Sequence, residues 1–325
     1  MPAQLEPRFQ MRTLARALVA LSLSAAVPAF AQTTPAEAPA STVKQVTVTA
    51  KRADAVNAFV AQISAPTIGT KQLARWDRTI CSGVLGLPEK HAQYMNDRIA
   101  LHAVEVGLSP GKPGCRANVL VMVTPEADAF VADIVRNHRK VFGDQAEEAG
   151  AAANGRKALI EFVKTPRAVR WWHITQTVTS DGTPIGDSVP TGDGVRPRSV
   201  NVHRVSRIRP DVRQDFAGVV IVVDAKRSGG VTYQALCDYI SMVALAQLDP
   251  RADTTALPSI LALFKDRDAG VPPPAALTEW DLSYLKGLYT VPGDARDAKH
   301  QEQDIAQEMK KDADKAEAKA AQAPK

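Results

Sequence analysis

The chain has 325 residues, of which 45% are hydrophobic, and its 40 Lys and Arg against 35 Asp and Glu give a net charge of +5. A charge this close to balance excludes an argument for nucleic-acid or anionic-membrane binding from composition alone. No run of 18 apolar residues follows residue 31, so we expect no transmembrane segment in the mature chain.

The first 31 residues have the three parts of an export signal. Arg8, Arg12 and Arg16 supply a basic start, and the segment Leu14 to Val27 is otherwise almost wholly apolar. Ala29-Phe30-Ala31 then supplies the small residues of a cleavage motif. We expect cleavage near Ala31-Gln32 and a periplasmic or secreted protein, with translation starting at Met1 or equally well at Met11. The loss of three arginines and one glutamate would leave 37 basic and 34 acidic residues, a net charge of +3.

Composition divides the mature chain into three parts. Residues 32–43 are rich in Pro, Ala and Thr, which predicts a disordered lead. Residues 44–293 suffice for one domain with a substantial core. Residues 294–325 carry eight acidic and seven basic residues with few large apolar groups, which predicts a charged, Ala-rich tail, helical or disordered, that stays solvated.

Elements of both kinds are predicted in the first half. Val46 and Val48 alternate with threonines at the period of a strand, whereas Ala53 to Ser64 has the apolar spacing of a helix. A longer helix is predicted from Pro88 to about Val106, with Tyr94, Ile99 and Val104 facing inward. The pattern then indicates a strand over 118–124, a helix from Pro125 to about Phe142 and a short helix over 157–164.

The second half predicts the rest of the sheet. Strands are expected over 168–179 and 198–208, and the most apolar one, Phe216 to Asp224, is expected at the centre. Helices are expected over 231–248 and 259–264, followed by a last packed helix capped by Thr278. The overall prediction is a single α+β domain with a mixed, largely antiparallel sheet and packed helices.

Three cysteines are present. Cys81 and Cys115 lie in polar, turn-rich surroundings and suit a disulfide in an oxidising compartment, although two separate free thiols remain an alternative. Cys237 shares an apolar helix face and is expected to be a buried thiol. No His or Cys stands two to four residues from Cys81 or Cys115, so we predict no metal site and no cofactor.

The search for catalytic patterns finds no H-E-x-x-H, G-x-S-x-G, P-loop or G-x-G-x-x-G, and the six histidines are scattered. Asp224 ends the most apolar strand and Asp238 lies in the next helix, so they are weak candidates for an acid–base pair. The alternative, which we prefer, is a turn-forming aspartate and an exposed helix aspartate.

A basic and aromatic cluster is the main positive signal. If strands 168–179 and 198–208 pair as a hairpin, their arginines and tryptophans share a surface that suits an anionic glycan, lipid headgroup or phosphate. Alternatively, the strand face is simply solvated, with Trp172 and Ile174 in the core. The candidate binding residues are Arg170, Trp171, His173, Arg204 and Arg207.

The stretch VTVTAKR, residues 46–52, resembles the energy-coupling box of outer-membrane TonB-dependent receptors. A receptor barrel needs about 22 strands, which some 250 foldable residues rich in helix cannot supply. We therefore interpret the stretch as the first, edge-prone strand of the domain, or alternatively as an exposed strand that pairs with an envelope partner.

The mature chain, over about residues 44–293, also resembles an uncharacterised family of exported proteins of Gram-negative, alphaproteobacterial-type bacteria. That resemblance rests on VTVTAKR, Trp76 with Cys81, Gly86-Leu87-Pro88, Cys115 with Asn118, Ser206-Arg207-Ile208, Asp238-Tyr239, Met242, Leu277-Thr278, Asp281-Leu282, Tyr284-Leu285 and Leu288-Tyr289. The family brings no established activity.

The final third faintly resembles degenerate zincin-like domains. Where a working zincin carries its metal-binding helix, this chain has Leu236 to Leu248, with Cys237, Asp238, Tyr239 and Gln247 in place of the ligands. The resemblance implies a lost metal site and a binding or scaffolding role.

The predicted function is therefore that of an exported periplasmic or envelope protein, a non-catalytic binding or scaffolding module. Its expected partner is an envelope protein or an anionic envelope component, not a nucleic acid. The alternative is a divergent hydrolase with a carboxylate-based site that has lost any zinc motif.

Overall fold

The computed structural model describes residues 40–67, 72–138, 142, 155–179, 181–183, 185, 189–191, 194–196 and 212–322, without the side chains of 40–50, 189–191 and 194–196. Residues Val46–Lys325 form one compact unit, and Met1–Gln45 are assigned to a second. The predicted export signal, most of the predicted lead and the predicted strand 198–208 lie outside the described residues.

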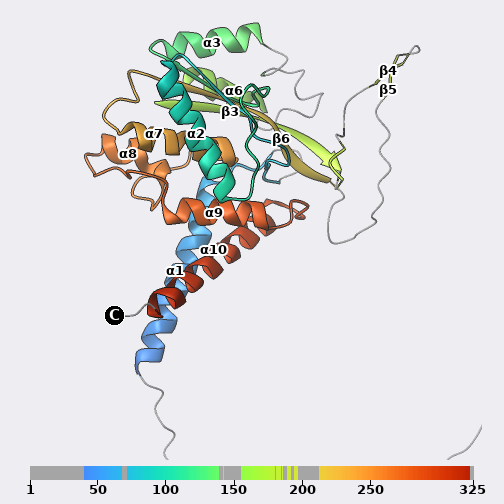
Figure 1. Cartoon of the computed structure of the whole chain (residues 1–325). Helices are drawn as coiled ribbons and strands as arrows, with labels where there is room; N and C mark the ends of the chain where they lie inside the picture. The colour runs from blue at the N-terminus through green and yellow to red at the C-terminus, as the bar shows by residue number, and fades with distance from the viewer. Residues whose placement is uncertain are drawn as a thin grey trace, which may run out of the picture. The chain divides into compact units, whose positions relative to one another are not determined.

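Four strands form the main sheet, in the order β1-β2-β6-β3 (Figure 1). They are β1 (Ser82–Leu85), β2 (Val119–Thr124), β6 (Val212–Asp224) and β3 (Val169–Thr179). β1 runs parallel to β2 and β2 parallel to β6, while β3 is antiparallel to β6. Two short strands, β4 (Val189–Thr191) and β5 (Gly194–Arg196), form a separate antiparallel pair.

The α+β class, the mixed sheet and the interior position of the most apolar strand are confirmed, but the largely antiparallel arrangement is wrong. The error comes from β1, whose parallel pairing with β2 was not predicted. This strand is only four residues long, contains Gly83 and lies in a stretch that its turn residues make look like a loop. The antiparallel pair of the sheet is formed by β3 and β6.

Helices cover both faces of the sheet. The larger apolar cluster joins Val121 and Ile221 to the buried sides of α1 (Ala40–Ile63), α2 (Glu89–Glu105), α7 (Tyr233–Leu245) and α9 (Glu279–Thr290). The smaller cluster joins Trp172 and Val222, from the opposite strand faces, to α3 (Ala127–Asn137) and α6 (Gly155–Lys164). Side chains that alternate along β3 and β6 are therefore buried on both sides.

The prediction of a strand at Val46 and Val48 is wrong, because both residues belong to α1. Val56, Phe59, Val60 and Ile63 are buried, as their helical spacing predicted. Packing of Val56 to Ile63 stabilises the C-terminal part of α1. Because no Pro or Gly interrupts its 24 residues, the helix continues towards the N-terminus and includes the alternating Val and Thr of residues 46–49. Neither an edge strand nor a strand for β-addition exists there.

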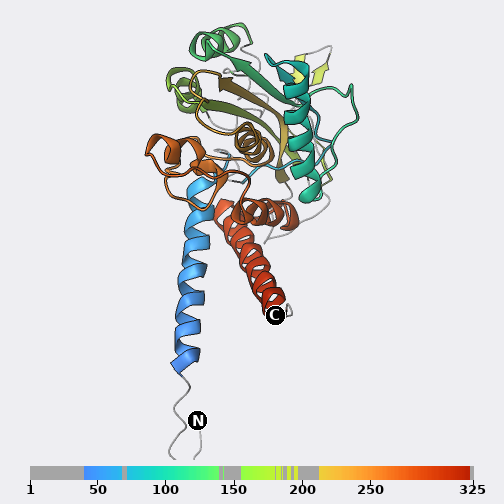
Figure 2. The same ribbon diagram turned by 60° about the vertical axis from the view of Figure 1, so that its left-hand side comes forward.

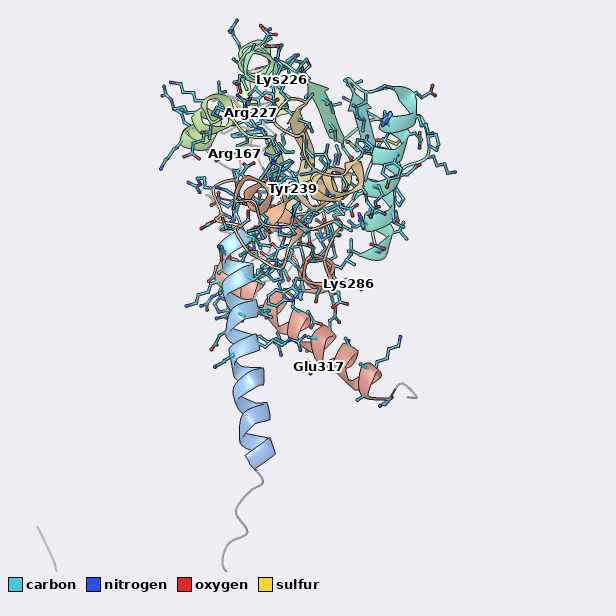
Figure 3. All side chains as sticks on the ribbon, turned by 90° about the vertical axis from the view of Figure 1, so that its left-hand side faces the viewer. Arg167, Lys226, Arg227, Tyr239, Lys286 and Glu317 are labelled. Atoms are coloured by element: carbon cyan, nitrogen blue, oxygen red, sulfur yellow. A yellow bond between two sulfur atoms is a disulfide. The ribbon has the colours of Figure 1, made fainter. Side chains whose placement is uncertain are left out.

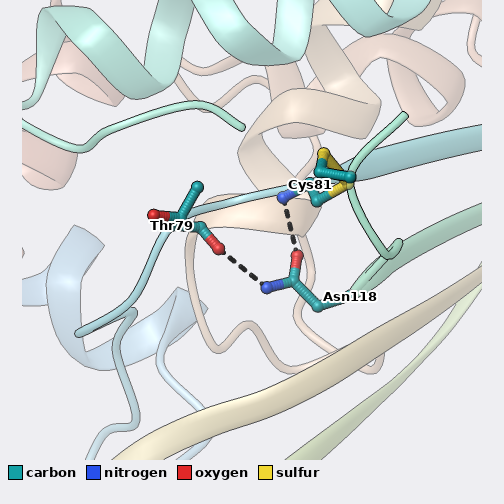
Figure 4. The surroundings of a disulfide bond; sticks show 4 residues. Thr79, Cys81 and Asn118 are labelled. Carbon is teal, nitrogen blue, oxygen red and sulfur yellow. Dashed lines mark hydrogen bonds between the residues drawn. A yellow bond between two sulfur atoms is a disulfide. The ribbon is translucent and has the colours of Figure 1, made fainter. Parts of the chain in front are cut away.

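Between β1 and β2 the chain forms α2 and a loop closed by the predicted disulfide. Cys81 and Cys115 are bonded, with their Cα atoms 6.0 Å apart, and Cys237 is a buried free thiol. Asn118 supports the same corner, because its side chain accepts from the Cys81 N–H and donates to the Thr79 carbonyl (Figure 4). The disulfide and Asn118 together fix where β1 begins beside β2.

The inward residues of α2 were predicted only in part. Ile99 is buried, but Tyr94 and Val104 are exposed. The buried face instead carries Met95, His102 and Ala103. A polar residue inside and an aliphatic residue outside reverse the usual pattern, and the reason is the ion-pair network around His102 described below.

The C-terminal elements begin with a 3-10 turn, η1 (Ile260–Ala262), and α8 (Leu263–Asp268). Thr278 caps α9 as predicted, in a reciprocal box with Asp281. Asp281 is fully buried, and its carboxylate also accepts from the Ile260 N–H at 2.7 Å. Burial raises the pKa of Asp281 despite these hydrogen bonds.

The charged tail is helical over α10 (Ala298–Ala321), shown in red in Figure 2. Its first half is not solvated as expected, because Ile305, Ala306 and Met309 are buried in the main core. Gln301 is fully buried as well, and its side-chain amide pairs with both backbone groups of Leu73. The low apolar content of residues 294–325 therefore did not indicate that one narrow side of α10 is buried.

Among the helices in the described part of the chain, none is both long enough and apolar enough to span a membrane.

Candidate functional site

The structure places three predicted binding residues in β3. Arg170, Trp171 and His173 are 2%, 8% and 1% exposed, so they form no open cationic surface. Helices cover both faces of β3, so the side chains of residues 169–173 are buried whichever face they point to. Trp172 and Ile174 pack in the smaller cluster, as the alternative interpretation expected. Arg204 and Arg207 lie outside the described residues.

Asp224 forms a turn at the end of β6. Its Oδ1 accepts from the N–H groups of Lys226 and Arg227, each at 2.9 Å, and its Oδ2 pairs with the Arg227 guanidinium. Burial alone would raise the pKa of Asp224, but these hydrogen bonds outweigh it and lower the pKa. This supports the turn-forming interpretation.

Asp238 is fully buried rather than an exposed helix residue. Arg98 binds its two carboxylate oxygens, each at 2.7 Å, and His102 Nε2 lies 3.0 Å from Oδ1. The Leu277 N–H donates to Oδ2 at 3.0 Å, and His102 Nδ1 lies 2.7 Å from Glu105. We call Arg98, His102, Glu105 and Asp238 the α2–α7 network. None of these four residues contacts Asp224, so the two aspartates belong to separate groups of contacts.

A cavity of about 650 Å³ opens at the carboxyl end of β6, beside the start of β3. Ligands of α/β proteins commonly bind outside the carboxyl ends of strands. Five basic and two acidic residues line this cavity: Arg167, Lys226, Arg227, Lys265, Arg267, Asp249 and Asp268. We call it the basic cavity. Figure 3 labels four of its lining residues, Arg167, Lys226, Arg227 and Tyr239.

Three of these cations are held by the protein itself. Lys226 pairs with Glu126 at 2.6 Å, and Arg227 pairs with Asp128 at 2.9 Å as well as with Asp224. Arg267 donates to the carbonyls of Arg227 and Gly229 and pairs with Asp268. These contacts order the rim of the cavity but leave little capacity for a ligand.

Arg167 and Lys265 are different, because neither makes a hydrogen bond or ion pair within the described part of the chain. Arg167 is half-buried at the cavity wall. The nearby carboxylate of Asp249 is already bound by Arg251, which donates to it at 2.9 and 3.0 Å. The guanidinium of Arg167 therefore keeps all its donors available.

Tyr239, on α7, supplies a second unpaired polar group. Its side chain is 8% exposed and lines the cavity, its ring packs 5.1 Å from that of Phe264, and its hydroxyl has no hydrogen-bond partner among the described residues. Burial raises the pKa of Tyr239, and the positive charge of Arg167 acts in the opposite direction. The hydroxyl oxygen is not one of the fully buried unpaired atoms of the described residues, so it reaches the cavity surface, where it can donate to a ligand.

A second cavity of about 360 Å³ adjoins the first and shares Arg167, Trp171 and residues 248–250 with it. Arg170, Trp172 and His173 also line it, so the predicted basic and aromatic residues of β3 do meet at one site. His173 Nε2 lies 2.9 Å from the Val243 carbonyl, and complete burial lowers the pKa of His173 to about 4. We call this space the edge cavity.

A third cavity of about 380 Å³ lies among α1, α9 and α10. Its two basic residues, Arg52 and Lys286, are balanced by Glu279 and Asp312. Lys286 is labelled in Figure 3, together with Glu317, the ion-pair partner of Arg52. This cavity lacks the excess of positive charge that distinguishes the basic cavity.

The candidate binding residues predicted from the sequence did not include Arg167, Tyr239 or Lys265. Tyr239 has the sequence context of a core residue, and Lys265 that of a surface lysine. The site could have been located from its position in the chain, because the turn after the most apolar strand lies where ligands of α/β proteins commonly bind.

Within the described residues, no three His, Cys, Asp or Glu side chains are grouped closely enough to hold a metal ion. No protein-family model, curated protein or solved structure matches the chain. The resemblances noted from the sequence therefore stay predictions, and the function has to be argued from the cavities themselves.

Proposed function

We propose that this chain is a non-catalytic binding protein that holds a small anionic molecule in the basic cavity, and that it does so in the periplasm or cell envelope. One observation carries the binding proposal: Arg167 and Tyr239 present a guanidinium and a hydroxyl to the same cavity, and neither has a protein partner. The envelope setting rests on the predicted export signal.

The lining favours a ligand with an anionic group and an apolar part. Arg167 and Lys265 suit a carboxylate or phosphate, and the Tyr239 hydroxyl can donate to the same group. Trp171, Phe264 and Leu261 provide apolar wall beside these groups. A volume of about 650 Å³ lies within the range of small-molecule sites.

Phenyl phosphate is a suitable probe, because it combines a dianion with an aromatic ring. Calorimetric titration of the purified protein should show saturable binding of phenyl phosphate and much weaker binding of phenol. Arg167→Gln should weaken binding by about tenfold or more, as expected for the loss of a hydrogen bond to a charged group. Tyr239→Phe should weaken it by roughly two- to tenfold.

Lys299→Gln is the matched control, because it removes an exposed positive charge from α10 and should leave the affinity unchanged. Equal affinities of the wild-type and Arg167→Gln proteins would contradict the proposal, as would equal binding of phenol and phenyl phosphate.

A further inference from the structure

The wall shared by the basic cavity and the edge cavity carries two side chains of opposite charge. Arg167 and Asp249 line both cavities. Burial alone would raise the pKa of Asp249, but its hydrogen bonds to Arg251 and the positive charges of Arg251 and Arg167 lower it. Asp249 is therefore ionised at neutral pH and attracts Arg167. Because an anionic ligand is attracted to the same guanidinium, Asp249 is a competitor of the ligand within the protein.

A tight turn fixes the backbone of Asp249. The sequence Asp249-Pro250-Arg251-Ala252 has aspartate and proline at the two positions that favour a β-turn, and the Ala252 N–H donates to the Asp249 carbonyl at 3.1 Å. The Asp249 N–H donates to the Ile63 carbonyl at 2.9 Å, which holds the start of the turn against the end of α1. The turn brings Arg251 within reach of the Asp249 carboxylate.

Arg251 binds both carboxylate oxygens of Asp249. Its backbone N–H and Nε donate to Oδ1, each at 2.9 Å, and its Nη2 donates to Oδ2 at 3.0 Å. Such a bidentate pair fixes the orientation of the carboxylate. The side chains are 56% and 23% exposed, so solvent screening limits what the pair contributes to stability. Arg251 also lies 3.8 Å from Glu161, and it lines the edge cavity but not the basic cavity.

Building on the proposed function, we propose that Arg251 is a positioning residue that keeps the basic cavity open to an anion by holding Asp249 away from Arg167. While Arg251 binds both oxygens of Asp249, Arg167 keeps its donors for the ligand. Without the Arg251 guanidinium, Asp249 would pair with Arg167, the other cation whose charge acts on it. An anionic ligand would then have to displace Asp249, which lowers its affinity.

A mutant cycle followed by calorimetric titration with phenyl phosphate tests this role. Arg251→Gln should weaken binding by about fivefold or more, because the ligand has to displace Asp249 from Arg167. Asp249→Asn should bind at least as tightly as the wild-type protein, because it removes the competitor. The double variant should match Asp249→Asn, since Arg251 has no carboxylate left to hold. Arg251→Lys retains a positive charge beside Asp249 and should recover part of the affinity.

The double variant separates positioning from a general effect of charge or of misfolding. If Arg251→Gln weakens binding equally in the wild-type and Asp249→Asn backgrounds, Arg251 does not act through Asp249 and the proposal is overturned. Unchanged affinity of the Arg251→Gln protein would overturn it too. Absence of phenyl phosphate binding by the wild-type protein would instead contradict the proposed function.

A measurement without ligand tests the contact between Asp249 and Arg167 on its own. Carbon NMR of the side-chain carboxyl group gives the pKa of Asp249 in each variant. Arg167→Gln should raise this pKa more in the Arg251→Gln background than in the wild-type background, because only there does Asp249 pair with Arg167. Equal shifts in the two backgrounds would show that Asp249 does not turn to Arg167, which would overturn the proposal whatever the titrations give.

Discussion

The α2–α7 network and the basic cavity both hold buried polar side chains, but they differ in how these groups are satisfied. In the network, Arg98, His102 and Asp238 bind one another in the core. At the basic cavity, Arg167 and Tyr239 have no hydrogen-bond partner in the described part of the chain. The first arrangement holds two helices together, whereas the second leaves donors ready for a ligand.

The comparison shows that a buried charge is not by itself a sign of function. Asp238 was a candidate catalytic residue, yet it accepts hydrogen bonds from Arg98, His102 and the Leu277 backbone. Burial alone would lower the pKa of His102, but its hydrogen bonds to Asp238 and Glu105 outweigh burial and raise it. The informative feature is a polar group that the fold leaves without a partner.

The largest expected effect comes from breaking the network. Asp238→Asn leaves Arg98 without a countercharge and removes one of the two carboxylates that bind His102, so it should reduce the free energy of unfolding by about 3–5 kcal/mol, measured by urea denaturation. Asp97→Asn, at an exposed position of the same helix α2, should change it by no more than about 0.5 kcal/mol. A loss below about 1 kcal/mol for Asp238→Asn would mean that the network is not a structural element.

The second effect is a pH dependence from His173. Burial lowers its folded pKa to about 4, below the unfolded value, so its stabilising contribution is complete above pH 6.5 and is lost as the pH falls toward 4. The wild-type protein should lose up to about 3 kcal/mol over this window relative to His173→Gln, whose amide can still donate to the Val243 carbonyl. Urea denaturation at several pH values measures the difference.

His102 sharpens this contrast because its pKa is raised. Its stabilising contribution is complete below pH 6.5 and is lost as the pH rises through the folded pKa.

The His173 prediction has a clear contradicting outcome. If the stabilities of the wild-type and His173→Gln proteins change in parallel between pH 6.5 and 4, His173 is not buried and neutral.

The smallest expected effect is at the basic cavity. Without ligand, Tyr239→Phe should change the free energy of unfolding by no more than about 0.5 kcal/mol, because its hydroxyl has no protein partner to lose. Tyr284→Phe is the matched control: its hydroxyl lies 3.2 Å from Ser64 Oγ, so this variant should lose about 1 kcal/mol. Equal losses in the two variants would show that Tyr239 has a protein partner after all.

Local chemistry made several features predictable. The spacing of Val56, Phe59, Val60 and Ile63 predicted the buried side of α1, and Thr278 predicted the start of α9. The Cys81–Cys115 bond was also expected correctly. The first two predictions rest on residues close in sequence. The disulfide was predictable because three cysteines allow only a few pairings.

The errors share a different origin. Val46 and Val48 alternate like strand residues, but their conformation is that of the helix continuing from Val56 to Ile63. The four residues of β1 carry too weak a pattern to be recognised, and β2 pairs with them only after the chain has passed through α2. Long-range packing thus overrode local propensity in these segments.

The sequence by itself determined the α+β class, the most apolar strand, the helix cap, the disulfide and a concentration of basic residues around β3. Only the tertiary structure decided which of those residues keep free donors. Whether a guanidinium or hydroxyl is paired depends on residues brought together from distant segments, as Arg98 is with Asp238 and as Arg167 and Tyr239 are around the basic cavity. Residue type and spacing cannot reveal that pairing, because a charged side chain has the same sequence signature whether or not the fold provides its partner.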